Sequence, residues 1–148
     1  MIGLRFRETM SGAYHLTAEP GEDRPFWFTV GVGIESVRSI LEDSLFTIEG
    51  MVHAEGLADH KRLTGTLRID PLRSKLLVYD FVFEGNDAQK YRFQGKKTLS
   101  EGDLLHAMTV LPGAISGPSG DEIATALLRF DLRSDIVRFL RSFRLVRS

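Results

Sequence analysis

A glutamate near the start of the chain is the residue whose position most clearly suggests chemistry. If residues 2–10 form a β-strand, Glu8 points to the same side as Phe6 and Met10, because successive side chains alternate between the two faces. A carboxylate among apolar side chains is costly unless it is paired or protonated, so we expect Glu8 to have a partner. Glu8 could anchor the polar group of a ligand, or act as a general acid or base with a raised pKa. The simpler interpretation is a structural hydrogen bond to the backbone or to a lysine or arginine.

Two charged residues in the middle of the chain are candidate partners of Glu8. On the strand at residues 89–97, Lys97 shares a face with Tyr91 and Phe93. On the preceding strand at residues 75–83, Asp80 shares a face with the apolar residues Leu76, Val78 and Val82. If these faces line the interior of the fold, Glu8, Asp80 and Lys97 form one internal polar cluster.

The histidines show no recognised metal-binding spacing. None belongs to a helical HExxH pair or to a similar motif. We therefore expect each to be a surface residue or a locally satisfied one, and we expect no metal site and no cofactor. The four are His15, His53, His60 and His106.

Two short segments are similar to ligand-binding motifs but lack their defining features. The sequence GVGIES at residues 31–36 has two glycines of a dinucleotide-binding turn, but the third glycine and the βαβ unit are missing. We interpret it as two glycines on one face of a strand. The sequence EGND at residues 84–87 lacks the spacing of an EF-hand loop and is better explained as a hairpin turn.

Composition excludes several classes of function. The chain has 148 residues, the size of one domain, and no cysteine, so disulfides, thiolate metal sites and cysteine nucleophiles are ruled out. Its net charge of −1 gives no electrostatic reason to bind nucleic acid. No apolar run approaches the about 20 residues of a membrane-spanning helix. The opening residues are charged where a signal peptide would be apolar, so we expect a cytoplasmic protein.

Alternating apolar and polar residues, interrupted by turn residues, predict a mainly β protein. Five-residue turns at 70–74 and 84–88 join three successive strands and favour an antiparallel meander. About eight strands in one domain favour a closed, lipocalin-like β-barrel, since closure removes exposed strand edges. The expected strands are residues 2–10 (ending near Gly12), 14–18, 26–34, 46–54, 62–69, 75–83, 89–97, 104–115 and 123–130.

Two helices are expected to accompany the strands. Residues 36–42 have the spacing of a short helix. Near the C-terminus, apolar residues recur at i, i+3, i+4 and i+7, which predicts an amphipathic helix lying on the core. Its apolar stripe is Ile136, Phe139, Leu140 and Phe143, and its solvated side carries Arg138, Arg141, Arg144 and Arg147.

The opening segment FRETMSG, residues 6–12, resembles the F-x-E-x-M-x-G start of a small bacterial domain. That domain is found fused to cholesterol-oxidase-like enzymes of the glucose–methanol–choline oxidoreductase family and to some hydrolases, whereas here it would stand alone. The resemblance extends through residues 28–34, 35–43, 48–52, 91–97 and 138–144. In those fusions the domain accompanies enzymes that act on sterols or other lipophilic substrates, while the flavin chemistry belongs to another domain. Because this chain has no flavin-binding fingerprint, the resemblance implies an accessory role without oxidoreductase activity.

These observations leave three hypotheses for function. The first is a non-catalytic module that holds a small lipophilic ligand, sterol-like or acyl, in a β-barrel. The second is a docking module with a solid core, which binds an oxidoreductase or a second copy of the chain. The third is an enzyme that uses Glu8 as acid or base. The expected ligand-binding residues are Glu8, Met10, Phe28, Phe46, Tyr79, Phe81, Phe93 and Lys97.

Overall fold

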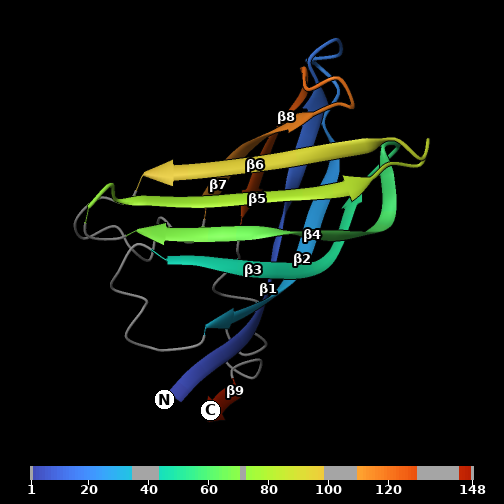
Figure 1. Cartoon of the computed structure of the whole chain (residues 1–148). Coiled ribbons are helices and arrows are strands. Elements are labelled where there is room, and N and C mark those ends of the chain that lie inside the picture. Colours follow the sequence, from blue (N-terminus) through green and yellow to red (C-terminus); the bar gives the residue numbers. More distant parts are fainter. Residues whose placement is uncertain (1, 35–43, 71–72, 99–109, 130–143, 148) are drawn as a thin grey trace.

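The described part of the computed structural model consists of strands and turns (Figure 1). It covers residues 2–34, 44–70, 73–98, 110–129 and 144–147. Within these residues no helix has the length and hydropathy needed to cross a membrane. The strands are β1 (Ile2–Leu16), β2 (Arg24–Ile34), β3 (Ser44–Ala54), β4 (Ala58–Asp70), β5 (Leu76–Glu84), β6 (Lys90–Thr98), β7 (Val110–Ser116), β8 (Glu122–Arg129) and β9 (Arg144–Arg147).

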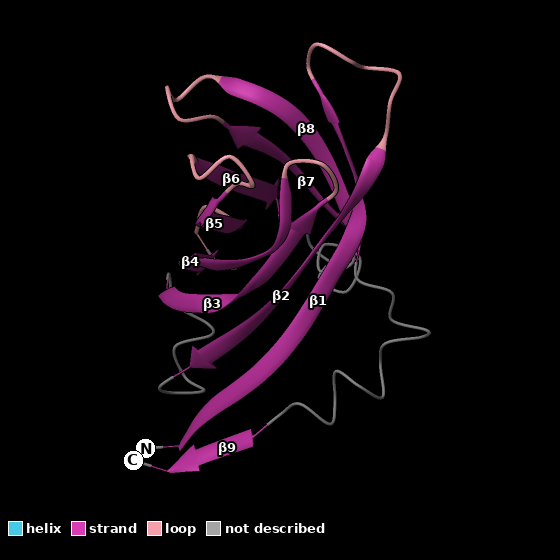
Figure 2. Cartoon of the chain, turned by 90° about the vertical axis from the view of Figure 1, so that its right-hand side faces the viewer, coloured by secondary structure: helices cyan, strands magenta, loops and turns pink. Residues whose placement is uncertain are grey.

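The strands β1 to β8 form a closed antiparallel barrel. Each strand pairs with the next along the chain, and β8 returns to pair with β1, so the sheet has no free edge there. The predictions of a mainly β fold, an antiparallel meander and a closed barrel are therefore confirmed. Figure 2 shows the curved wall that results, with β1 running along its full height.

The first strand is longer than expected, because it does not end near Gly12. The segments predicted as two strands, residues 2–10 and 14–18, are one strand, β1. A Cβ atom at Gly12 would overlap the backbone carbonyl of Leu127 in β8. This glycine therefore allows β1 to approach β8 closely where the barrel closes, and it does not mark a turn.

Two strands share one edge of β1. The strand β8 pairs with the second half, from Ser11 opposite Arg129 to Leu16 opposite Ala124. The short strand β9 pairs with the beginning of β1, from Ile2 to Arg5, and Figure 2 shows the two together at one end of the molecule.

The structure contradicts part of the predicted C-terminal helix, and the predicted helix at residues 36–42 lies outside the described residues. Arg144 and Arg147 were expected on a terminal helix, but both belong to the strand β9, where backbone pairing with β1 overrides the helical spacing of the sequence. The expected helix at residues 36–42, the apolar stripe at 136–143, and Arg138, Arg141 and His106 lie outside the described residues. The same is true of the first part of the strand expected at 104–115.

The glycines and turns that were interpreted as structural have that role. Gly31 and Gly33 lie within β2, where the chain continues as a strand. In the turn after β5, the amide of Gly85 donates to the carbonyl of Gln89 at 2.8 Å. After β4, the carboxylate of Asp70 accepts hydrogen bonds from the amides of Arg73 and Ser74 at 3.2 and 3.0 Å.

Aromatic rings pack across the interior of the barrel. Phe28 on β2 is fully buried, and its ring lies 5.1 to 5.8 Å from the rings of Tyr79, Phe81 and Phe93. Phe81 and Phe93, on neighbouring strands, are 4.9 Å apart. Along β5 and β6 these residues alternate with less buried ones, so strand alternation alone places them on the inside.

Close approach between neighbouring strands restricts one inward-facing position to glycine. A Cβ atom at Gly50 on β3 would overlap the carbonyl oxygen of Thr29 on β2. The obstacle is backbone, which cannot move without opening the ladder between the two strands. A side chain at this position therefore distorts the barrel wall.

We expect the substitution Gly50→Ala to lower the free energy of unfolding by about 2–3 kcal/mol, the usual cost of forcing extra atoms into a packed site. Urea unfolding monitored by circular dichroism measures this. The matched control is Gly33→Ala on β2, where no heavy atom lies within 4 Å of the added Cβ. That variant should stay within about 0.5 kcal/mol of the parent. Equal effects of the two substitutions would contradict the assignment of close approach at Gly50.

Candidate functional site

Glu8 lies buried on the inward face of β1. Its side chain is 7% exposed, and its Oε1 atom has no hydrogen-bond partner within the described part of the chain. The sequence-based expectation that Glu8 faces the interior is confirmed. Within the described residues, the expected structural hydrogen bond is not made by Oε1.

The surroundings of Glu8 are apolar. Directly across the ladder lies Val30 of β2, and Gly50 of β3 follows on the next strand. On β1 itself the next inward side chain is Met10, which is 2% exposed and lies opposite Phe28. Glu8 is thus connected through Met10 to the cluster of aromatic rings.

Burial raises the pKa of Glu8 to about 7, because the charged form loses its hydration there. Near neutral pH both protonation states are therefore populated. The protonated carboxyl can donate a hydrogen bond, and the ionised form can accept one. The side chain can thus recognise either kind of polar group on a ligand.

Asp80 does not belong to the interior, contrary to the expected polar cluster. It lies on the outer face of β5, where its Oδ1 accepts a hydrogen bond from Nε of Arg92 at 2.8 Å. This hydrogen bond holds the pKa of Asp80 below its ordinary value. The correction follows from alternation, since Tyr79 and Phe81 on either side of Asp80 point inward.

Lys97 is half-buried and lies in the inward register of β6, two residues beyond Gly95. The internal cluster of Glu8 with Lys97 stays a prediction. The other expected ligand-binding residues all have buried side chains. They are Met10, Phe28, Phe46, Tyr79, Phe81 and Phe93.

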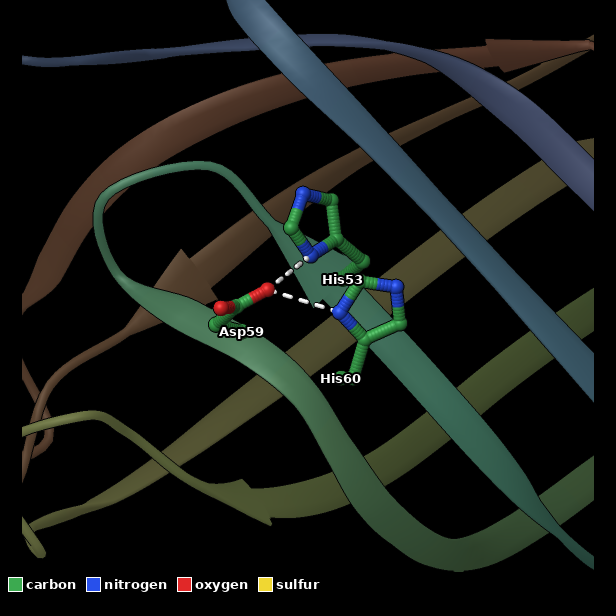
Figure 3. Close-up of side chains that lie close together, drawn as sticks. All are labelled: His53, Asp59 and His60. Atoms are coloured by element: carbon green, nitrogen blue, oxygen red, sulfur yellow. Dashed lines mark hydrogen bonds and ion pairs between the residues drawn. The ribbon is translucent and has the colours of Figure 1, made fainter.

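A second polar cluster, which the sequence did not reveal, lies outside the barrel at the β3–β4 hairpin (Figure 3). The Oδ1 atom of Asp59 lies 3.0 Å from Nδ1 of His53 and 2.7 Å from Nδ1 of His60. The hydrogen bond with His60 is the main reason why the pKa of Asp59 is lowered. Their donor atoms all lie within 4.8 Å of one another, an arrangement that could hold a metal ion.

The sequence shows no metal-binding spacing for the histidines, but the fold brings His53 and His60 together beside Asp59. The available signal was a short hairpin connection around Gly56, which brings residues on both sides of it together. His15 is close to a different carboxylate, with its Nδ1 3.5 Å from Oδ1 of Asp23.

The raised pKa of Glu8 predicts how the free energy of unfolding depends on pH. In the unfolded chain Glu8 ionises near its ordinary pKa of 4.5, whereas the folded chain keeps the proton up to about pH 7. The folded state therefore binds more protons in this window, and the free energy of unfolding falls as the pH rises through it, by on the order of 3 kcal/mol. Below pH 4.5 this contribution is fully present.

The substitution Glu8→Gln removes the ionisable group and should remove this pH dependence. Relative to the parent, the variant should gain stability between pH 4.5 and pH 8, as measured by urea unfolding at several pH values. Parallel pH profiles for the two proteins would show that Glu8 is not buried as a neutral acid.

Comparison of the chain with protein-family models, with curated proteins and with solved structures gives no match. The resemblance to the accessory domain of glucose–methanol–choline oxidoreductases therefore stays a prediction based on residues 6–12 and the segments after them.

Proposed function

We propose that this protein is a binding module of the lipocalin-like type, which holds a small lipophilic ligand and contacts the ligand's polar group through Glu8. The observation that carries the proposal is the buried Oε1 atom of Glu8, which lacks a hydrogen-bond partner within the described residues. An unsatisfied buried polar atom costs about 1–3 kcal/mol, so a ligand that satisfies it recovers this free energy on binding.

The chemistry around Glu8 favours a ligand with one polar group on an apolar body. Met10, Val30 and Val32 offer only apolar contacts beside the carboxyl group, and each is at most 2% exposed. A protonated Glu8 would donate to the carbonyl of an acyl chain, and an ionised Glu8 would accept from the hydroxyl of a sterol. Apolar sites with few polar groups are typical for such molecules.

The packed rings limit where the ligand would lie. Phe28 already contacts Tyr79, Phe81 and Phe93, so this part of the interior is occupied by side chains. The ligand would therefore lie on the Glu8 side of Met10, with the aromatic cluster as the apolar floor of its site.

Ligand binding is tested by native mass spectrometry of the purified protein and by a thermal-shift screen of fatty acids and sterols. We expect a bound lipophilic molecule or a rise in Tm with one of these classes, because a ligand that binds only the folded state stabilises it. Glu8→Gln should weaken binding by roughly tenfold, the value of one lost hydrogen bond to a buried group.

The control is Glu49→Gln, which alters an exposed glutamate on the outer face of β3 and should leave binding unchanged. Absence of a co-purified molecule and of any thermal shift would contradict the proposal. In that case docking onto an oxidoreductase or onto a second copy of the chain becomes the better hypothesis, and light scattering and pull-down would test it. If the parent protein converts a substrate and the variant Glu8→Gln does not, this result would indicate acid–base catalysis by Glu8.

A further inference from the structure

We propose that His53, Asp59 and His60 form a binding site for a divalent transition-metal ion of the Zn²⁺, Cu²⁺ and Ni²⁺ class, on the outer face of the β3–β4 hairpin (Figure 3). Two imidazoles and a carboxylate are donors that these ions accept. The site is separate from the barrel interior and from Glu8.

The donor atoms are already close to the spacing that a metal ion needs. With metal–ligand bonds of about 2.0–2.2 Å, neighbouring donors of a tetrahedral site lie roughly 3.3 Å apart. The carboxylate oxygen of Asp59 lies 3.0 Å from one imidazole nitrogen and 2.7 Å from the other. Asp59 and His60 are exposed, so their side chains can adjust by a few tenths of an ångström at small cost.

An irregularity in the ladder brings the three residues together. Val52 pairs with Lys61 and Ala54 pairs with Ala58, so the single residue His53 faces both Asp59 and His60. This is a β-bulge, which places two residues of one strand opposite one residue of its neighbour. His60 adopts a positive φ of 51°, which is uncommon for a residue other than glycine, and consecutive residues 59 and 60 are both exposed as a result.

Neighbouring elements hold the ligands in place. The amide of Asp59 donates to Oδ1 of Asn86 at 2.9 Å, and the amide of Asn86 donates to the carbonyl of Leu57 at 2.8 Å. The turn between β5 and β6 thus supports the hairpin that carries Asp59. Trp27 packs its ring against His53 and His60, with centroids 5.7 and 5.5 Å apart, and so restricts the orientation of both imidazoles.

Hydrogen bonding alone leaves this cluster incompletely satisfied. Among the described residues, the buried Nδ1 of His53 makes no hydrogen bond of good geometry, although it lies 3.0 Å from the carboxylate of Asp59. The two imidazole rings are only 4.5 Å apart, and the Nδ1 atoms of both lie close to the same oxygen of Asp59. A divalent cation would satisfy both nitrogens and the carboxylate at once, with water completing its coordination.

The single tryptophan of the chain gives a direct test, because Trp27 is in ring contact with both histidines. Cu²⁺ is titrated into the protein, free of any histidine tag, while tryptophan fluorescence is recorded. We expect saturable quenching at one ion per chain. Zn²⁺, which has a filled d shell, should reverse the quenching by competition, and isothermal titration calorimetry should report the same stoichiometry.

The variants Asp59→Asn and His60→Asn should each weaken Zn²⁺ binding by at least about tenfold, since loss of even an outer-sphere partner costs that much. Asparagine tolerates positive φ, so His60→Asn removes the imidazole without straining the bulge. The control is His15→Ala, which removes a histidine near another carboxylate and should bind as the parent does. No saturable quenching in the parent, or equal binding by all variants, would overturn the proposal.

Discussion

Closure of the sheet between β1 and β8 is the constraint on which the rest of this structure depends. Once β8 pairs with β1, every strand from β1 to β8 has two neighbours and the sheet has an inside and an outside. Alternation then assigns each side chain to one of two environments, an aromatic interior or the solvent-facing wall. Gly12 permits this closure, because a larger residue there would meet the backbone of β8.

The two candidate sites are both exceptions to the rules that the barrel otherwise follows. Glu8 is a carboxylate on the inward face, where its neighbours are apolar and burial raises its pKa to about 7. His60 has a positive φ within a strand, and the bulge around it turns two consecutive polar residues outward. Local departures of this kind are expected to concentrate at functional positions, because elsewhere they cost stability without benefit.

The two sites are kept apart by the wall of the barrel. Glu8 points inward from β1, whereas the histidines and Asp59 project outward from β3 and β4, with Trp27 of β2 beside them. The strand β2 contributes to both, since Val30 faces Glu8 on the inside and Trp27 faces His53 on the outside. Alternation along β2 thus places one residue beside the apolar surroundings of Glu8 and another beside the polar cluster at His53.

The sequence alone determined the class of fold and placed Glu8 on the same strand face as apolar residues, because period-two patterns and turn residues act over short distances. Residues 62–97 show this best, since their strands and turns lie close to the expected positions. The outward direction of Asp80 was missed, because it shares its strand with apolar residues on both faces and only barrel closure decides which face is buried.

Only the tertiary structure decided the joining of two segments into β1, the strand β9 and the cluster at His53. Each depends on a neighbouring strand. The strand β8 packs closely against β1 at Gly12, and β9 pairs with the beginning of β1. At the bulge, β4 places two residues opposite one residue of β3. These pairings join strands that are far apart in the sequence or shift the register between neighbouring strands. The one-dimensional pattern of side chains does not encode which strands meet or where a ladder shifts by one residue.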